Sequence, residues 1–524
     1  MKLIRRSLPY VVVFTSSMGI MIIELVASRL VSKYFGSSLY TWTGVIGVVL
    51  GGMSLGNFLG GRLADRFRPR DIISLLLIAA SALTFLVLAL DLALDAILSN
   101  LEFSVVTTAV IVRSFVVIFV LFFLPSASLG TISPVMAKYA LDESDRVGGT
   151  VGSIYAMSAT GSIFGTFLSG YVLIPMLGIR TIVFLVGGVI AVLALVMGGR
   201  RLIRAASTAW MGVIAAGFLL AVHAGPASEG ALYATDTQYA HLKVKDRDAG
   251  GRRERLLIMD GLIHNVYDPD RPDTLLYEYE RVFAALARPV AERLTGGEAG
   301  RTAAEDRAAG GGLSTLTLGG GACVFPAYME RRYAESRNVV VEIDPEVIRI
   351  AERYFDAPEG LDIVIADARN YVAAAGGEQE FDLLFLDAFN SFSVPYHLTT
   401  LEFTEELSSL LAVNGLFMAN CVDILELGGF LTAYMNTVKR VFPHVRVYQT
   451  PGTTVDRRST FVIAAARRPL GGGMLRDEAG RTVAEPVSPD IIRDLVRRNG
   501  DGILTDDFAP VESLIAPVFL RSVD

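Results

Sequence analysis

The chain has 524 residues, of which 52% are hydrophobic and 19% charged, and its mean hydropathy is +0.47. That composition is too apolar for one soluble domain, and the length favours more than one domain. The net charge of −7 gives no indication of a nucleic-acid partner. The two cysteines, Cys323 and Cys421, form neither a metal-ligand spacing nor a disulfide framework, and we expect both to be small core residues.

The first part of the chain is predicted to span a membrane. A span needs about 20 mainly apolar residues, because the backbone polar groups must be satisfied inside the segment. The first candidate is not a cleavable signal peptide, since it runs into Arg29 and Lys33 without a small-residue cleavage site. The candidate spans are residues 8–31, 39–61, 72–92, 105–135, 150–175, 179–198 and 207–223.

Basic residues of the short loops indicate the orientation of these spans. Four clusters lie on one side, which is predicted to be the cytoplasm, at residues 2–6, 62–70, 138–146 and 200–204. Six spans leave the rest of the chain on that side. A seventh span at 207–223, which is short and rich in Ala and Gly, would place it outside, unless that segment lies in the interface or packs as a re-entrant helix.

Small residues and two charges stand out inside the predicted spans. Glycines at helical spacing favour close helix packing. The segment GGRLADRFRPR (60–70) resembles the loop between the second and third helices of major facilitator transporters. Glu24 and Arg113 lie within spans, where charges are paired or functional; Arg113 could instead extend to the interface from a helix end. The glycines are Gly51, Gly52, Gly56, Gly60 and Gly61 in the second span and Gly148, Gly149, Gly152, Gly161, Gly165 and Gly170 in the fifth.

The remaining residues, 225–524, have the composition of soluble protein. Residues 237–261 predict two strands around a polar turn, followed by a helix near 274–294. Residues 295–312 are a Gly- and Ala-rich insertion. Short apolar strands then alternate with helices, which predicts a parallel, doubly wound sheet. The elements in order are the strand LSTLTL, a helix from Val324, NVVVEIDP, a helix from Glu346, IVIADAR and FDLLFLDAF.

Four motifs end the predicted strands, where such sheets bind ligands. Gly319, Gly320 and Gly321 allow a tight turn and close backbone approach. Glu342, about 20 residues on, favours ribose binding over a solvated strand-end carboxylate. Asp367 is placed to contact adenine and can also cap the helix that follows. Asp387 faces the same crevice, and its alternative role is to form a turn.

On these motifs the sequence resembles the spermidine synthase (polyamine aminopropyltransferase) family in its membrane-fused form. The resemblance covers residues 233–465. It includes MDGLIHN (259–265) for the family's L-D-G-x-x-Q, LLYEYE (275–280) for its Y-x-E, TLGGGA for G-G-G-D-G, VVEIDP, ADAR and LDAFNSFSVPYHLTTLEF for D-S-x-D-P-x-G-P.

The resemblance implies roles for individual residues. Asp387 would take a proton from the attacking amine of a diamine such as putrescine, and the aminopropyl group would come from decarboxylated S-adenosylmethionine. Contacts to this co-substrate are expected from Gly319, Gly320, Gly321, Glu342, Asp344, Asp367, Ala368, Pro395, His264 and Gln238. The amine channel is expected to contain Tyr277, Tyr279, Asn390, His397 and Asp423, although His397 could equally be structural.

Three departures from the family pattern leave the substrate open. Ala322 stands where the family has an Asp that contacts the aminopropyl ammonium, Asn390 replaces the second acid of D-x-x-D, and Ala240 replaces a Gln. Losing carboxylates weakens selection for a cationic substrate. Methyl transfer from intact S-adenosylmethionine therefore remains an alternative, as does a non-catalytic transporter or sensor that binds a nucleoside or polyamine.

The sequence therefore predicts a multi-pass α-helical membrane domain joined to an α/β Rossmann-like, S-adenosylmethionine-type domain with a small N-terminal β subdomain. The expected boundaries are 1–224, 225–273 and 274–524. We expect a cell-membrane protein with its soluble part in the cytoplasm, where S-adenosylmethionine is made. Its expected partners are a small polyamine and the lipid bilayer, and no metal or nucleic acid is expected. Because dimers are common in the family that the sequence resembles, we expect a homodimer.

Overall fold

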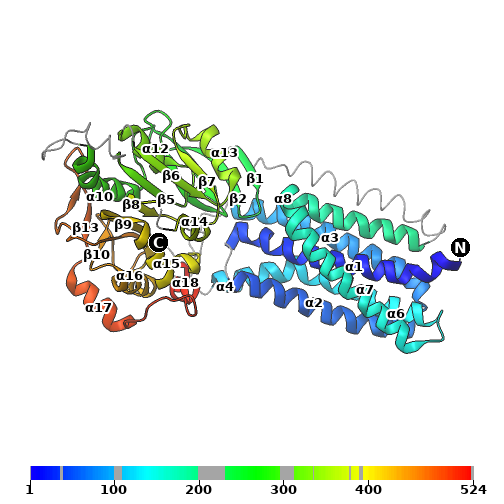
Figure 1. The fold of residues 1–524 in the computed structure, drawn as a ribbon. Coiled ribbons are helices and arrows are strands. Elements are labelled where there is room, and N and C mark those ends of the chain that lie inside the picture. Colours follow the sequence, from blue (N-terminus) through cyan, green and yellow to red (C-terminus); the bar gives the residue numbers. More distant parts are fainter. Residues whose placement is uncertain are drawn as a thin grey trace. The chain divides into compact units, whose positions relative to one another are not determined.

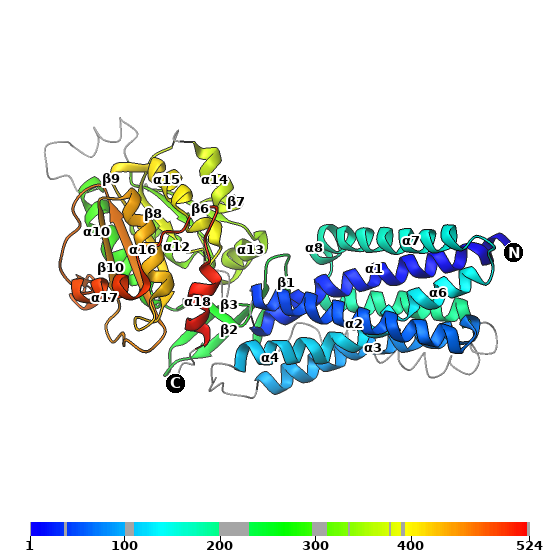
Figure 2. The same ribbon diagram turned by 90° about the horizontal axis from the view of Figure 1, so that it is seen from below.

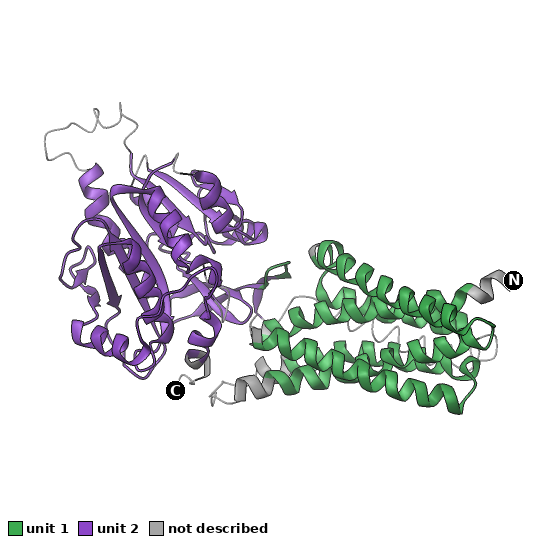
Figure 3. Ribbon diagram, turned by 60° about the horizontal axis from the view of Figure 1, so that its bottom comes forward, with its two compact units in different colours: residues 1–103, 108–228, 235–241 green, residues 104–107, 229–234, 242–524 purple. Residues whose placement is uncertain are grey.

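The computed structural model describes residues 2–35, 39–99, 109–198, 230–295, 312–333, 336–376, 379–388 and 394–520. The described chain divides into two compact units (Figure 3). Unit 1 contains the N-terminal helices together with residues 235–241, and unit 2 contains residues 230–234 and those from 242 onward. The finer domain boundaries expected from the sequence stay a prediction.

Unit 1 is helical throughout its N-terminal part (Figure 1). π-helical turns at Phe119–Phe123 and Ser169–Leu173 interrupt two of its long helices. The helices are α1 (Lys2–Phe35), α2 (Leu39–Arg66), α3 (Pro69–Ser99), α4 (Ala109–Ile118), α5 (Leu124–Gly130), α6 (Ile132–Leu141), α7 (Val147–Leu168), α8 (Ile174–Met176) and a further helix at Ile179–Gly198.

Six helical segments among the described residues are long and apolar enough to cross a membrane. They correspond to the first six predicted spans, and the seventh, at 207–223, lies outside the described residues. The segments are Ser7–Ser32, Tyr40–Arg66, Pro69–Leu94, Ser114–Leu141, Val147–Leu173 and Ile179–Gly198.

Glycine allows two pairs of these helices to approach closely. A Cβ atom on Gly56 of α2 would lie 2.1 Å from the carbonyl oxygen of Ala127 in α5. A Cβ atom on Gly161 of α7 would lie 2.2 Å from the carbonyl oxygen of Phe14 in α1. Tight packing is therefore confirmed at these positions. The prediction of tight packing is wrong for the five glycines that face open space, Gly61, Gly148, Gly149, Gly152 and Gly170.

Unit 1 contains a buried ion pair that the sequence analysis missed. Asp91 of α3 is fully buried, and its carboxylate lies 3.0 Å from Nε of Arg180 and accepts a 2.8 Å hydrogen bond from the Tyr34 hydroxyl. Asp91 lies near the end of the predicted span 72–92. A carboxylate at such a position is expected to belong to the loop that follows the span. The predicted charges were Glu24, which is half-buried, and Arg113, whose side chain lies outside the described residues.

A small sheet opens the C-terminal part of the chain. Its strand order is β1-β2-β3-β4, and β2 and β3 form the antiparallel hairpin predicted for residues 237–261. The two outer strands were not predicted. The strands are β1 (Ala231–Asp236), β2 (His241–Asp248), β3 (Arg253–Met259) and β4 (Leu262–Tyr267).

The main sheet of unit 2 has nine strands in the order β12-β13-β10-β11-β9-β8-β5-β6-β7. Neighbouring strands from β7 through to β9 are parallel, and β11, β10, β13 and β12 extend the sheet by antiparallel pairs. The strands are β5 (Ser314–Leu318), β6 (Arg337–Glu342), β7 (Asp362–Ile365), β8 (Phe381–Leu386), β9 (Leu411–Asp423), β10 (His444–Gln449), β11 (Ser459–Ala466), β12 (Leu475–Arg476) and β13 (Thr482–Pro486).

Helices cover both faces of this sheet (Figures 1 and 2). One face packs on α10 (Glu278–Thr295), α12 (Val324–Arg332) and α13 (Pro345–Tyr354). The other packs on α14 (Ala368–Ala375), α15 (Leu401–Leu410), α16 (Gly429–Val441), α17 (Pro489–Asn499) and α18 (Val511–Leu520). The helices predicted near 274–294, from Val324 and from Glu346 are thus α10, α12 and α13.

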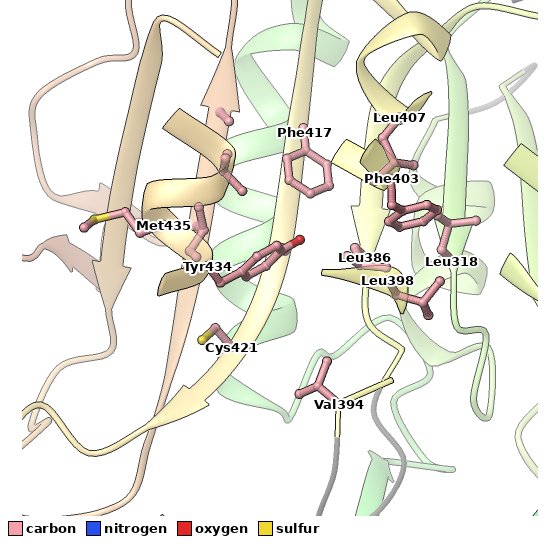
Figure 4. Close-up of a cluster of buried hydrophobic side chains, with 14 of the residues drawn as sticks. Leu318, Leu386, Val394, Leu398, Phe403, Leu407, Phe417, Cys421, Tyr434 and Met435 are labelled. Atoms are coloured by element: carbon pink, nitrogen blue, oxygen red, sulfur yellow. The ribbon is translucent and has the colours of Figure 1, made fainter. Parts of the chain in front are cut away.

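Alternation along the strands separates the two layers of core. In β8, Leu383 and Phe385 face α10, whereas Leu384 and Leu386 face the opposite layer. Figure 4 shows the second layer, where Phe403 lies close to Leu318 and Leu386. Cys323 and Cys421 are buried free thiols, as expected. Together the strand order and the two helical layers confirm the doubly wound, Rossmann-like architecture.

Candidate active site

The site lies where the chain changes direction in the sheet. From β5 the chain proceeds to β6 and β7 on one side and then returns to β8 on the other. The carboxyl ends of β5 and β8 flank this switch point, where doubly wound sheets bind ligands. Gly319 follows β5 with φ +92°, and a Cβ atom there would lie 2.5 Å from the carbonyl oxygen of Asp387. Only glycine fits this approach without moving the backbone.

Glu342, at the end of β6, holds the glycine turn in place. Its Oε2 accepts hydrogen bonds from the backbone N–H groups of Gly320 (3.0 Å) and Gly321 (3.1 Å). Its Oε1 accepts from Ile343 (2.9 Å) and Asp344 (3.1 Å). Burial raises the pKa of Glu342, and these backbone donors oppose the rise. A carboxylate has about four acceptor positions, so a ribose hydroxyl would have to share one that already serves the turn.

Two hydrogen bonds hold the carboxylate of Asp387, which follows directly after β8. Its Oδ2 accepts a 2.7 Å hydrogen bond from the Tyr279 hydroxyl, and its Oδ1 accepts a 2.8 Å bond from Nδ2 of Asn420. Burial raises the pKa of Asp387 to about 6, although both hydrogen bonds lower it. A carboxylate with such a pKa is ionised at pH 7 and can still accept a proton.

A cavity of about 450 Å³ opens in front of this carboxylate. Its volume is that of a small-molecule site. Nε2 of His264 is buried beside it and has no hydrogen-bond partner among the described residues. Burial, with a smaller contribution from Arg458, lowers the pKa of His264 to about 4. The lining residues are Gly261, Leu262, Ile263, His264, Asn265, Tyr277, Tyr279, Gly319, Gly321, Asp387, Asn420, Val422, Arg458, Ser459 and Thr460.

Two buried residues beneath the cavity were missed by the sequence analysis. Asn265 accepts a 2.8 Å hydrogen bond from the backbone N–H of Ala322 and so ties β4 to the glycine turn. Glu280 is completely buried in α10, where Asn265 and the backbone of Tyr277 lie close enough to lower its pKa by hydrogen bonding. Burial and the charge of Asp387 raise the pKa of Glu280 well above its usual range. Both residues stand inside motifs quoted above, MDGLIHN and LLYEYE, where the spacing alone indicated no role.

Several predicted contacts lie outside the cavity lining. Asp344 caps α13 through the backbone N–H of Glu346 at 2.9 Å. Asp367 caps α14 through Asn370 at 3.0 Å, as its alternative role predicted, and its other oxygen lies 3.3 Å from Nε2 of His397. Ala368 begins α14, and Pro395 precedes the short helix Tyr396–Leu398.

Two more predicted residues are absent from the lining of this cavity. Asp423 is fully buried, its oxygens accept from the backbone N–H groups of Ile424 (2.7 Å) and Leu431 (2.8 Å), and it does not line the cavity, so its place in an amine channel stays a prediction. Gln238 is exposed and belongs to unit 1. Asn390 lies outside the described residues. Of the predicted set, the structure gathers Gly319, Gly321, His264, Tyr277, Tyr279 and Asp387 around one cavity.

Taken together, the fold and this site define a Rossmann-like unit with a strand-end carboxylate above a nucleoside-sized cavity. The chain matches no protein-family profile. Over 143 residues it is 37% identical to a polyamine aminopropyltransferase of Vibrio vulnificus, which covers 27% of this chain and 47% of that protein. Over 142 residues it is 31% identical to an N-terminal histidine N-methyltransferase of Emericella nidulans, covering 26% of this chain and 25% of that one.

Among solved structures, the chain is similar to a probable spermidine synthase from Corynebacterium glutamicum. The identity is 23%, the TM-score 0.42, and the match covers 53% of this chain and 97% of the other. The chain spans about half the length, or less, of the curated relatives it matches. The relatives are therefore aminopropyltransferases and methyltransferases. The matches cover too little of their length to assign either activity to this chain.

Proposed function

We propose that the protein is a membrane-bound aminopropyltransferase that moves the aminopropyl group of decarboxylated S-adenosylmethionine to a diamine. The observation that carries this proposal is the Asp387 carboxylate, held between Tyr279 and Asn420 at the switch point and facing the cavity. The similarity to a polyamine aminopropyltransferase supports it.

The chemistry needs a base at that place. The nitrogen lone pair of the diamine attacks the carbon next to the sulfonium, the C–N bond forms, and the C–S bond breaks. The bonding pair returns to sulfur, so that methylthioadenosine leaves as a neutral thioether. The amine must lose a proton, and Asp387 accepts it, because its raised pKa of about 6 suits a general base near neutral pH.

The surrounding residues suit a cationic amine and an adenosyl group. Tyr277 and Tyr279 line the cavity, and aromatic faces attract ammonium groups. His264 is neutral at pH 7 because burial lowers its pKa to about 4, and its unpartnered Nε2 is available for one hydrogen bond to the bound nucleoside. In this proposal Glu342 shares an acceptor position with the ribose, and Asp367 and Pro395 border the adenine.

The six apolar helices support residence in a membrane. An even number of spans leaves both ends of the helical part on one side, and the basic loops indicate that this side is the cytoplasm. We propose a cell-membrane protein whose catalytic unit faces the pool of S-adenosylmethionine.

Methyl transfer from intact S-adenosylmethionine is the second candidate, and one observation favours it. Ala322 is fully buried directly after the glycines, so the turn offers no carboxylate for the aminopropyl ammonium. One relative is an N-methyltransferase. A base at Asp387 would serve either reaction.

The product nucleoside distinguishes the two candidates. Purified full-length protein in detergent is incubated with putrescine and decarboxylated S-adenosylmethionine, or with intact S-adenosylmethionine, and the nucleosides are separated. Methylthioadenosine that Asp387→Asn does not form supports the proposal, and S-adenosylhomocysteine supports methyl transfer. Tight nucleoside binding without turnover of either co-substrate would contradict both and indicate a binding module.

A further inference from the structure

Unit 2 contains a second pocket that the proposed reaction does not use. It has a volume of about 400 Å³ and lies between α10, α12 and the β12–β13 hairpin, and it shares no lining residue with the active-site cavity. We call it the arginine pocket. Its charged lining residues are Arg281, Arg288, Arg331, Arg332, Arg476, Arg481, Asp273, Asp477 and Glu478.

The lining has an excess of positive charge. Six arginines face three carboxylates in a chain whose net charge is −7. All three carboxylates are already engaged, Asp273 with Arg331 (2.7 Å), Asp477 with Arg481 (2.7 Å) and Glu478 with Arg332 (2.8 Å). Arginine is the commoner basic residue throughout this chain, so the residue type alone carries no weight. What requires explanation is that six arginines and only three carboxylates line one concave surface.

Of the other three guanidinium groups, Arg476 has no carboxylate partner among the described residues, and Arg281 interacts electrostatically with the buried Glu280. Nε of Arg281 is buried without any hydrogen-bond partner. Arg288 lies 4.0 Å from the carboxylate of Glu292 and donates a 3.1 Å hydrogen bond to the carbonyl of Arg476. Arg476 donates to the carbonyl of Gly480 at 2.7 Å. A buried donor without an acceptor is unfavourable unless a ligand or water satisfies it.

Helix α10 explains the hollow itself. Arg281, Ala284, Ala285 and Arg288 are spaced i, i+3, i+4 and i+7, so they share one face of the helix. The two small residues between the arginines leave a recess that longer side chains would fill. Tyr328 of α12 forms part of the opposite wall.

We propose that the arginine pocket binds a polyvalent phosphate anion, of the class of inorganic polyphosphate or the phosphate chain of a nucleoside triphosphate. Arg476, which has no carboxylate partner among the described residues, and Arg288, whose carboxylate partner lies 4.0 Å away, supply guanidinium groups for a short phosphate chain, and charge-assisted hydrogen bonds to phosphate are among the strongest that arginine forms. In a nucleoside triphosphate, the base would contact the ring of Tyr328 in the pocket wall.

Inorganic tripolyphosphate is the appropriate first probe, because it has no nucleoside with which to enter the active-site cavity. Isothermal titration of the full-length protein in an uncharged detergent is expected to show saturable binding that weakens as salt is raised. The variant Arg288→Gln should weaken binding about tenfold, and Arg288→Gln/Arg476→Gln about a hundredfold. Ala284→Phe fills the recess without changing charge and should also abolish binding.

Arg497→Gln is the matched control, because it removes the same charge from the exposed face of α17, far along the chain from the pocket. It should bind tripolyphosphate as the unaltered protein does. A double variant with unchanged affinity, an equal loss in the control, or no saturable binding at low salt would overturn the proposal. ATP distinguishes the source of the phosphate: tighter binding that Tyr328→Leu removes identifies a nucleotide, and equal affinity identifies the phosphate chain alone.

Discussion

At the residue scale, the environment of Asp387 determines the pH range in which the proposed base is deprotonated. Its pKa is raised to about 6 by burial and held from rising further by Tyr279 and Asn420. A base works only when deprotonated, so kcat/KM should fall about tenfold per pH unit below pH 6. The change Tyr279→Phe removes one hydrogen bond to the ionised form and should move this acid limb upward by about one unit. A pH series of nucleoside release measures the shift.

Tyr277 supplies the matched control for that experiment. It lines the same cavity, but its hydroxyl donates to the carbonyl oxygen of Ile263 at 3.0 Å and forms no hydrogen bond with Asp387. The change Tyr277→Phe should therefore leave the acid limb in place, whatever it does to the rate. Equal shifts in the two variants, or none in Tyr279→Phe, would show that Asp387 does not set the pH dependence.

The same carboxylate is expected to reduce the stability of the fold at neutral pH. Because the pKa of Asp387 lies at about 6 in the folded protein and at 3.8 ordinarily, the folded state binds more protons between these values. Its contribution to stability is present below pH 4, is lost as pH rises through 6, and amounts to about 3 kcal/mol. Asp387→Asn should therefore be more stable at pH 7.5.

The substitution is tolerable because Oδ1 of Asn420 is buried without a partner, so a turned Asn420 amide can accept from the new side chain. Hydrogen exchange of peptides from β8 measures the opening free energy. The advantage of the variant should disappear near pH 4. An Asp387→Asn protein that opens more readily than the unaltered one at pH 7.5 would contradict this account.

At the element scale, the turn between β5 and α12 depends on the absence of a side chain at Gly319. Gly319→Ala should destabilise unit 2 by several kcal/mol, because the new Cβ atom would lie 2.5 Å from a backbone oxygen. Gly452→Ala separates strain from crowding, since Gly452 has φ +88° and open space around it. That control should lose only about 1 kcal/mol.

Brief exposure to protease in increasing urea measures this difference as the fraction of unit 2 that remains intact. The midpoint for Gly319→Ala should lie well below that for Gly452→Ala. Coincident midpoints would mean that the backbone around Asp387 moves to accommodate the new Cβ atom. The close approach of β5 to β8 would then not require a glycine at position 319.

The parallel half of the sheet was predictable at this scale because each strand is a short apolar run that ends in a motif. Gly319, Glu342, Asp367 and Asp387 each follow such a run, and the order of the strands brings the ends of β5 and β8 together. The hydrogen bond from Asn370 shows that Asp367 caps α14, and its expected contact with adenine stays a prediction.

Strand β9, the antiparallel strands beyond it and the support of Asp387 were not predictable. Asn420 reaches Asp387 because β9 pairs with β8, a pairing between segments about 30 residues apart for which no motif exists. Glu280 stands in an amphipathic helix, where a charged residue is expected to face water, yet it is fully buried beneath the cavity. Such positions follow from tertiary packing, which overrides the local pattern.

At the scale of the whole molecule, the number of spans decides on which side of the membrane the catalytic unit lies. Six apolar helices are described, and a seventh candidate at 207–223 lies outside the described residues. Because the native thiols at Cys323 and Cys421 are buried, single cysteines placed on the surface can report sidedness over a low background. Asp145→Cys marks the loop between α6 and α7, and Thr454→Cys marks an exposed turn of unit 2.

With six spans, a membrane-impermeant maleimide should label neither cysteine in intact spheroplasts and both after permeabilisation. Asn100→Cys, in the loop predicted to lie outside, is the positive control that should react without permeabilisation. Labelling of Thr454→Cys but not Asp145→Cys in intact spheroplasts would place an odd number of spans before unit 2. It would also separate the proposed enzyme from cytoplasmic S-adenosylmethionine, and the proposed reaction would then need a supply of its co-substrate on the outer side.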